Sequence, residues 1–469
     1  MSGFFMNPFF HRMRSFYSEQ MIFSGFICLL AVTGGSSRAD EPIQIVVRLL
    51  ALAGLAFAVF FRPIPFDRAL RPAAIALAAA GIAIAIQLIP LPPSVWEHLP
   101  GRELYAQQGR IAGVENIWRP LSLSPDRTWN ALLSLLVPLS VVALAAKLNR
   151  RRRQATLSLL VGILAFTALV ALFRLITGQS WFTFLHSTDA GGSGVFANRN
   201  HQALLFAMGI PLLATWVVED RLSSINTRLR WTIGAAGAAT LMILIPTTGS
   251  RAGLALGGLA VLMATTILWK PASRLLQQVR HRKMRRLILA LGCVALAGMT
   301  SLALTLSRAE GVQRLMTMDV AGDTRTRLLP RVLEMTSAYF PAGAGYGSFD
   351  PAFRRFEHLS DLKQTYFNQA HDDLLQIVIE GGGLGIALLT GALAWLLVQS
   401  IRVWRASATT TSIRMARLAS FLLLLMIIAS VVDYPLRTPF MMALFALFTI
   451  WLYEPAAMDN DSAAANSLA

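Results

Sequence analysis

The sequence predicts an all-α, polytopic membrane protein with about twelve transmembrane helices. Apolar residues make up 55% of the 469 residues and charged residues only 14%, whereas a soluble domain carries about 25% charged residues. About 20 consecutive apolar residues cross a bilayer as a helix, and the chain holds twelve such runs. Transmembrane β-strands are shorter and alternate in polarity, and disordered chains lack so much apolar surface. Both alternatives are therefore excluded.

The twelve apolar runs are rich in Ala, Gly and Leu, which suits closely packed helices in lipid. The first run follows Arg12 and Arg14 and has the charge pattern of a signal peptide, but no small-residue cleavage site follows it, so we expect a retained helix. The runs lie at residues 21–34, 43–61, 73–91, 129–146, 156–177, 203–218, 231–247, 252–269, 287–306, 374–398, 416–433 and 438–453.

The basic residues predict the orientation of these helices. The net charge is +17, and Lys and Arg concentrate in alternate loops, most densely at residues 147–153 and 270–286. Basic loops face the cytoplasm, so both termini are expected there. This explanation of the charge replaces nucleic-acid binding, and no nucleic-acid partner is expected.

The chain divides into five predicted segments. Residues 1–20 read as a cytoplasmic amphipathic segment and residues 21–306 as the first nine spans, followed by a large outer loop at residues 307–371. Residues 372–453 form the last three spans, and residues 454–469 read as a disordered tail because they are rich in Ala, Ser and Asp.

The large outer loop contains a predicted helix and a glycine-rich turn. Residues 324–340 read as a helix despite Pro330, with Arg327, Arg331 and Glu334 on one face. The glycines of the following PAGAGYGSF superficially suggest a nucleotide loop. No strand precedes them, so a tight turn packed on the membrane surface is the preferred interpretation.

Two arginines in short outer loops are the main candidates for anion binding. Arg199 in GVFANRNHQA and Arg251 in TTGSRAG lie among small or polar residues where a helix begins. Topology rules disfavour positive charge there, and a guanidinium at a helix amino end can grip phosphate oxygens through a bidentate fork. Arg174 and Arg437 are secondary candidates, because they and Arg48 are expected to snorkel towards lipid headgroups.

His371, in NQAHDDLLQIVIEGGGLG, is the candidate general base, because its unperturbed pKa suits proton transfer near neutral pH. His201, which follows Asn198 and Asn200, competes for this role. Asp372 and Asp373 can cap the next helix or join His371 in a metal site, but adjacent carboxylates do not by themselves make a ligand set. No metal or other cofactor is therefore expected. Four glycines should let this helix bend or approach a neighbour closely: Gly381, Gly382, Gly383 and Gly385.

These residues resemble the O-antigen ligase and polymerase superfamily of multi-pass bacterial glycosyltransferases. The resemblance is carried by GVFANRNHQA, TTGSRAG, the Arg327 helix with PAGAGYGSF, and HDDLLQIVIEGGGLG, which occur in this order. The last segment is similar to the ligase pattern of His, an amide or Ser, nine residues, then G-x-x-G. Gly382 and Gly385 are in register, but Asp372 replaces the usual amide or Ser. That departure leaves ligase and polymerase both open.

The resemblance implies a GT-C-like helical fold and a metal-independent, inverting glycan transfer at the periplasmic face of the bacterial inner membrane. It implies that Arg199 and Arg251 bind the diphosphate of a polyprenyl-linked glycan donor and that His371 activates the acceptor hydroxyl. Arg327 is a further candidate for diphosphate or acceptor, or forms a salt bridge with Glu334 or Asp323. The acceptor, which the sequence does not specify, is lipid A–core, a growing glycan or a protein.

Two other classes of function stay open. A transporter or flippase of a lipid-linked anionic glycan should carry ionisable residues near the membrane midplane. The nearest acids are Glu380 and Asp433, and neither lies at the middle of a span. A scaffold for envelope synthesis would not require Arg199, Arg251 and His371 to converge. The enzyme interpretation predicts that these three side chains share one cavity.

Overall fold

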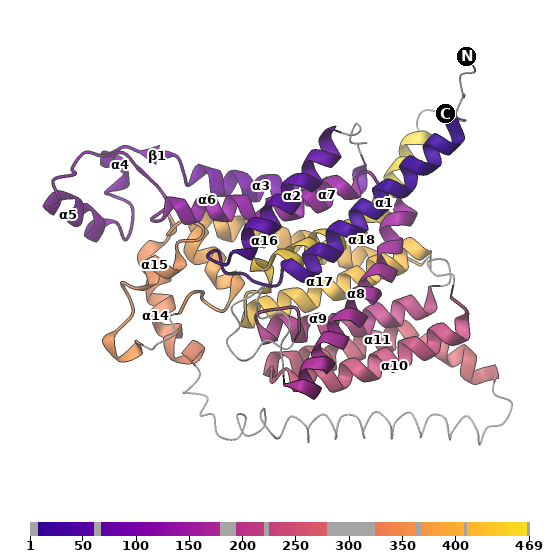
Figure 1. Cartoon of the computed structure of the whole chain (residues 1–469). Coiled ribbons are helices and arrows are strands. Elements are labelled where there is room, and N and C mark those ends of the chain that lie inside the picture. The colour runs from indigo at the N-terminus through magenta and orange to yellow at the C-terminus, as the bar shows by residue number, and fades with distance from the viewer. Residues whose placement is uncertain are drawn as a thin grey trace, which may run out of the picture.

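Long antiparallel helices make up most of the chain (Figure 1). The computed structural model describes residues 8–60, 67–178, 194–219, 225–278, 324–362, 367–407 and 410–466. The long helices are α1 (Pro8–Thr33), α2 (Ile43–Phe60), α3 (Arg71–Ile86), α6 (Pro125–Ser134), α7 (Leu136–Ala145), α8 (Arg150–Thr177), α9 (Arg199–Val218), α10 (Thr227–Thr247), α11 (Arg251–Gln278), α16 (Asp373–Arg405), α17 (Thr411–Val432) and α18 (Pro439–Asn466). The shorter elements are η1 (Arg68–Leu70), β1 (Pro90–Leu91), α4 (Pro93–Trp96), α5 (Glu103–Ile111), β2 (Arg119–Pro120), α14 (Thr324–Tyr339), α15 (Phe349–Phe353), η5 (Leu359–Asp361) and η6 (Pro435–Arg437).

The all-α, multi-pass prediction is confirmed for the described residues. Ten helices are long and apolar enough to cross a membrane, and α1 contributes a shorter apolar stretch at Glu19–Thr33. Helices α6 and α7 together make one of the ten, Pro125–Ala145. The predicted run at residues 287–306 lies outside the described residues. The only strands described, β1 and β2, form a two-residue antiparallel pair.

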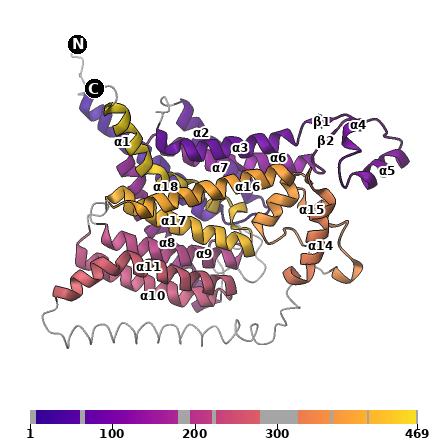
Figure 2. The same cartoon turned by 180° about the vertical axis from the view of Figure 1, so that it is seen from behind.

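Helix α9 lies at the centre of one half of the bundle and is buried along almost its whole length. It packs against α8, α10, α11 and α17 (Figure 2). Small residues allow the closest of these contacts: a Cβ added to Gly253 of α11 would lie 2.4 Å from the Cβ of Ala203 in α9. Such small-residue contacts are the usual way in which helices associate in lipid.

The glycine-rich turn packs on α16 where that helix is interrupted. Gly382 has φ 57° and ψ −141°, and a Cβ there would lie 2.1 Å from the carbonyl oxygen of Pro341. The backbone N–H groups of Ala344 and Gly345 donate to the carbonyls of Ile379 and Glu380 at 2.9 and 3.0 Å. The turn thus satisfies backbone groups freed by the kink. The predicted bend occurs at one glycine, and the turn is a packing element.

Most of the short elements gather at one end of the bundle, where α14 and α15 share a small hydrophobic cluster. Leu328, Met335, Phe349 and Phe353 are all at most 1% exposed. Helices α9, α11, α16 and α18 begin at this end (Figures 1 and 2), which we call the site face. Helix α14 confirms the helix predicted at residues 324–340. The segment at residues 92–128 contains α4, α5 and the strand pair.

The predicted start of the tail at residue 454 lies within a helix. Helix α18 continues to Asn466, and the buried Glu454 accepts hydrogen bonds from Arg153 at 2.8 Å and Gln154 at 2.9 Å. Alanine, which is frequent in the tail, is also the strongest helix former. Its frequency therefore allows the helix to extend. The start of α1 and the end of α18 lie at the same end of the bundle, opposite the site face (Figure 1).

Candidate functional site

Three helices of the site face begin at residues that the sequence singles out. Arg199 is the first residue of α9, Arg251 is the first of α11, and α16 begins directly after Asp372. Each start is held by a short polar side chain, as helix amino ends require. Asn198 accepts from the N–H of Asn200 at 2.8 Å, Ser250 from Gly253 at 2.9 Å, and Asp372 from Leu375 at 3.0 Å. Asp372 is therefore the capping residue of α16.

Asp433, directly after α17, connects these elements. Its Oδ2 accepts from the amides of Asn198 at 3.1 Å and Asn200 at 2.5 Å, and its Oδ1 lies 3.4 Å from Nδ1 of His371. A guanidinium nitrogen of Arg325, from α14, lies 3.7 Å from Oδ2. One buried carboxylate thus gathers groups from α9, α14 and the segment before α16. We call Asp433, Asn198, Asn200, Arg325 and His371 the Asp433 cluster.

The environment of Asp433 keeps its carboxylate ionised. Burial alone raises the pKa of this carboxyl, but the hydrogen bond from His371 and the nearby His201 and Arg325 outweigh burial and hold the pKa well below its usual range. The opposite holds at Asp372, where burial raises the pKa despite the hydrogen bonds from the backbone of Leu375 and Leu374. The two carboxyls near His371 thus differ, and Asp433 is the permanent anion.

His371 is oriented by contacts on several sides. Its backbone has φ 54°, a left-handed conformation that few residues other than glycine adopt. Its ring lies 4.9 Å from the ring of Tyr434 and 5.3 Å from that of Phe367, measured between centroids. Because a carboxylate only accepts, Nδ1 donates to Asp433, and Nε2 is then the basic nitrogen. The side chain is 19% exposed, so a substrate can reach it.

The competing base, His201, is enclosed. It is 1% exposed and lies edge-on to Tyr434, with ring centroids 5.4 Å apart. Its Nε2 is 3.5 Å from the side-chain amide of Asn198. His201 therefore lies behind the Asp433 cluster and supports its packing, whereas His371 faces outward. Accessibility favours His371 over His201 as the base.

The two arginines of the predicted anion site come from neighbouring helices. Arg251 is exposed at the start of α11. Nη1 of Arg199 lies 3.7 Å from the position that a Cβ on Gly249 would occupy. The Arg199 guanidinium is therefore against the turn that carries Arg251, and its neighbours Asn198 and Asn200 bind Asp433. The start of α9 thus lies at the Asp433 cluster, and the turn before α11 adjoins Arg199.

In α14, Arg325 belongs to the Asp433 cluster, whereas Arg327 contacts a different acid. Nε of Arg327 lies 3.8 Å from a carboxylate oxygen of Asp361, and Glu334 pairs with Arg331 at 3.3 Å. The described partner of Arg327 is thus Asp361 and not Glu334, while Asp323 lies outside the described residues. Arg325 donates to the carbonyl of Val432 at 2.6 Å besides approaching Asp433.

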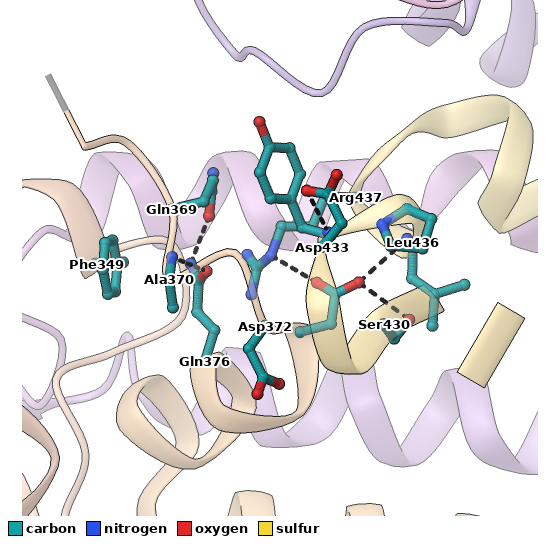
Figure 3. A network of polar contacts seen from close by, with 12 residues as sticks. Phe349, Gln369, Ala370, Asp372, Gln376, Ser430, Asp433, Leu436 and Arg437 are labelled. Carbon is teal, nitrogen blue, oxygen red and sulfur yellow. Dashed lines mark hydrogen bonds and ion pairs between the residues drawn. The ribbon is translucent and has the colours of Figure 1, made fainter. Parts of the chain in front are cut away.

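Arg437 is enclosed in a buried ionic network and does not snorkel as expected. Its guanidinium lies 3.1 Å from Asp373 and 3.3 Å from Glu380, and Asp373 also accepts from the N–H of Leu436 at 3.2 Å. Ser430, Leu436 and Arg437, labelled in Figure 3, all donate to the Asp373 carboxylate, and Gln376 of the same figure is bonded to Gln369 and to the backbone N–H of Ala370. This network fixes the start of α16. The other secondary arginine candidate, Arg174, lies elsewhere, in the last turn of α8.

A cavity of about 680 Å³ opens beside this network. Its lining includes Asp373 and Arg437 but not His371, Arg199 or Arg251. This cavity therefore does not meet the prediction that His371, Arg199 and Arg251 share one cavity. The start of α9 and the segment before α16 are nevertheless joined through Asp433. Within the described ranges, no group of three or more His, Cys, Asp or Glu has a metal-binding arrangement.

The fold and site thus define a polytopic helical membrane protein with cationic and imidazole groups on one face. Residues 235–390 match the family model described as O-antigen ligase, which confirms the resemblance to the O-antigen ligase and polymerase superfamily. The match includes Arg251, Arg327 and His371, and its ends leave Arg199 and Asp433 outside. No curated protein matches the chain.

Sequence reasoning missed Asp433 and Arg325 as members of the site. Asp433 was visible as an acid at the end of a span in VVDYPLRTP, where a charge is costly unless it is paired. Its pairing with Asn198 and Asn200, more than 230 positions earlier, has no local signature. Arg325 differs from Arg327 only in its position on α14, which the sequence does not place relative to α17.

Proposed function

We propose that the protein transfers a glycan from a polyprenyl-diphosphate carrier to an acceptor hydroxyl, as an O-antigen ligase or polymerase does. One observation carries the proposal: Asp433 joins the start of α9, next to Arg199, to His371. The start of the helix that carries Arg199, a cation suited to phosphate, is thereby linked to an accessible imidazole oriented by a carboxylate. This combination is what expulsion of a diphosphate by an alcohol requires.

In the proposed step, the acceptor oxygen attacks the anomeric carbon while the bond from that carbon to the diphosphate oxygen breaks. Nε2 of His371 takes the hydroxyl proton, and Asp433 stabilises the imidazolium that forms. The leaving polyprenyl diphosphate gains negative charge, which Arg199 and Arg251 neutralise. Attack from the side opposite the diphosphate inverts the anomeric configuration. Because both arginines are fixed at helix starts, the charge stabilisation is preorganised without a metal.

The proposal places the site at the periplasmic face of a bacterial inner membrane. The basic loops at the opposite end of the bundle support this orientation. Lipid A–core, a growing glycan or a protein would serve as the acceptor. The polyprenyl chain would lie in the bilayer beside the helices.

The test is reconstitution of the purified protein in proteoliposomes with a synthetic polyprenyl-diphosphate-linked glycan. The proposal predicts release of polyprenyl diphosphate and transfer of the glycan. A deletion strain identifies the subclass: loss of long chains on lipid A indicates a ligase, and single-repeat capping indicates a polymerase. Unchanged lipopolysaccharide with a missing secreted polymer indicates an exopolysaccharide system.

Transport of an intact lipid-linked glycan is the alternative function. A transporter would need an ionisable residue near the membrane midplane, and the acid nearest to that position is Glu380. This carboxylate is fully buried, is paired with Arg437, and accepts from Gln376 at 3.0 Å and from the N–H of Phe349 at 3.3 Å. These contacts are those of a fixed packing network. Protected movement of the donor across the bilayer, with no cleavage of the diphosphate bond, would support the transporter instead.

A further inference from the structure

A further arginine, Arg48, lies within the bundle and is far from Arg199 and Arg251 in the sequence. Arg48 is on the second turn of α2 and is half-buried. Its guanidinium donates to the side-chain oxygen of Asn130 in α6, and both residues line the 680 Å³ cavity. Arg48 is expected to snorkel to the lipid around the bundle, but its side chain is held towards α6 and lines the cavity instead. A charge within an apolar span usually faces such a cavity and serves a function.

Arg48 differs from the other arginines that line this cavity. Arg38 pairs with Asp40 at 2.8 Å, Arg127 with Asp350 at 3.0 Å, and Arg437 with Asp373 at 3.1 Å. Within the described part of the chain, no carboxylate forms an ion pair with Arg48. The remaining acid of the lining, Asp126, is exposed in the first turn of α6, where a negative charge is favoured by the helix dipole.

The cavity changes from polar to apolar along its length. Towards the site face it is lined by Arg48, Asn130, Asn368 and Gln369. Further along α16 the lining becomes Leu389, Leu393 and Leu396, with Ile427 of α17 and Phe445 of α18 opposite. From Asp373 to Leu396 the path follows α16 for about 35 Å at the usual helical rise. Its volume falls in the range of ligand sites, about 300–1,000 Å³.

We propose that this cavity binds an anionic lipid whose headgroup pairs with Arg48 and Asn130 and whose hydrocarbon chain follows α16. A guanidinium and an amide together can donate several hydrogen bonds to phosphate oxygens. The apolar remainder of the cavity matches a hydrocarbon chain and offers nothing to a free anion. The lipid site is separate from the arginines of α9 and α11, because none of those residues line it.

The position of the cavity gives this lipid a role that rests on the proposed function. Its wall includes Asp373, two residues after His371, together with Asn368 and Gln369 just before His371. A lipid headgroup in the cavity therefore adjoins the segment that carries His371, at a place whose lining includes neither Arg199 nor Arg251. With the donor diphosphate at those two arginines, the lipid in the cavity is the acceptor.

The proposed contact between the lipid headgroup and Arg48 is tested by measuring how much lipid the purified protein retains. This measurement does not depend on glycan transfer. Purified protein is exchanged with vesicles of equal phosphatidylglycerol and phosphatidylcholine, and retained lipid is counted by native mass spectrometry. The wild-type protein should retain phosphatidylglycerol in preference to phosphatidylcholine. Arg48→Gln should lower that retention at least tenfold, whereas Arg110→Gln, at an exposed arginine of α5 outside the cavity, should not change it.

The proposed path of the lipid's hydrocarbon chain along α16 is tested by a matched pair of substitutions on that helix. Ala392 lines the cavity and Ala394 does not, and both are exposed. Ala392→Phe should therefore reduce retention, and Ala394→Phe should leave it unchanged. Equal retention by Arg48→Gln and wild type, or by Ala392→Phe and Ala394→Phe, would overturn the proposal.

Two competitors identify the ligand. Inorganic phosphate alone should not displace the retained lipid, and displacement by phosphate at equal concentration would reveal a simple anion site. Polyprenyl phosphate should compete weakly; preferential, Arg48-dependent retention of polyprenyl phosphate would assign the cavity to the donor and contradict the proposal. His371→Ala should retain lipid normally, so failure of lipid binding and failure of the transfer reaction are separately visible.

Discussion

Charged residues at the two ends of the bundle are organised differently. Opposite the site face, Arg153 is 3% exposed and pairs with Glu454 at 2.8 Å and Asp67 at 2.6 Å. Its charge is neutralised in a closed network. At the site face, the carboxylate of Asp433 is enclosed, but the His371 ring is partly exposed and Arg251 is exposed. Both ends contain arginines and carboxylates, so residue type does not distinguish them. The two ends differ in how far these charges are buried and in their ion-pair partners.

This comparison predicts that substitutions at the two ends fail in different ways. At the Arg153 end they should lower the free energy of unfolding without a specific effect on chemistry. At the site face they should lower the transfer rate of a protein that still folds. Each prediction below uses purified, membrane-reconstituted protein, so that folded protein and activity are measured separately.

The largest effect on activity is expected for His371→Ala. Loss of a positioned base removes about 10²- to 10⁴-fold in rate, while the amount of protein in the membrane should stay unchanged. The measured quantity is polyprenyl diphosphate released per folded molecule. His201→Phe is the control, because that ring is enclosed and serves packing. Near-normal release by His371→Ala together with loss in His201→Phe would exchange the two roles.

Arg251→Lys should be nearly as severe. A lysine keeps the charge but loses the bidentate fork, and loss of one well-placed donor to a developing oxyanion costs about 10²- to 10³-fold. The same substitution at Arg110 should leave turnover unchanged. Wild-type turnover in Arg251→Lys would indicate that simple positive charge or lipid anchoring is sufficient at this position.

Asp433→Asn should have an intermediate effect, about 10- to 10²-fold, because it alters the group that orients the base. The depressed pKa of Asp433 also gives a pH signature. Its carboxylate stabilises the fold fully above the unfolded-state pKa of about 3.9, and this contribution is lost as pH falls through the lower folded pKa. The stability difference from wild type should therefore be constant between about pH 8 and pH 5 and shrink below. A difference that disappeared already near pH 6 would contradict this charge assignment.

The smallest effect on chemistry is expected at the opposite end. Arg153→Ala leaves Glu454 buried without its partner and should destabilise the fold by about 3–5 kcal/mol. Turnover per folded molecule should stay near wild type, as measured after separating folded protein by size exclusion. A specific loss of turnover at unchanged stability would show that the two ends are coupled.

The sequence predicts the membrane helices well because their signal is local. Runs of apolar residues and helix-start residues such as Asn198 and Asp372 act within a few positions, and α9 and α16 begin where these signals place them. The continuation of α18 past Glu454 was missed, because burial of that carboxylate depends on Arg153, about 300 positions earlier.

The site is predictable only in part for the same reason. His371, Arg199 and Arg251 stand out by charge and position, but Asp433 acquires its role through contacts between α9, α14 and α17. Arg437 and Arg48 were both expected to reach lipid headgroups. Their side chains turn inward because Asp373 and Glu380, or Asn130, lie on a neighbouring helix that the sequence does not position.

The most direct test of the central claim is a double-mutant cycle on His371 and Asp433, read as release of polyprenyl diphosphate from a radiolabelled donor. If Asp433 acts through the imidazole, Asp433→Asn slows the wild-type enzyme by about 10- to 10²-fold and adds nothing to the residual rate of His371→Ala. Independent, multiplying losses in the double variant would contradict the claim that the two side chains work as one unit.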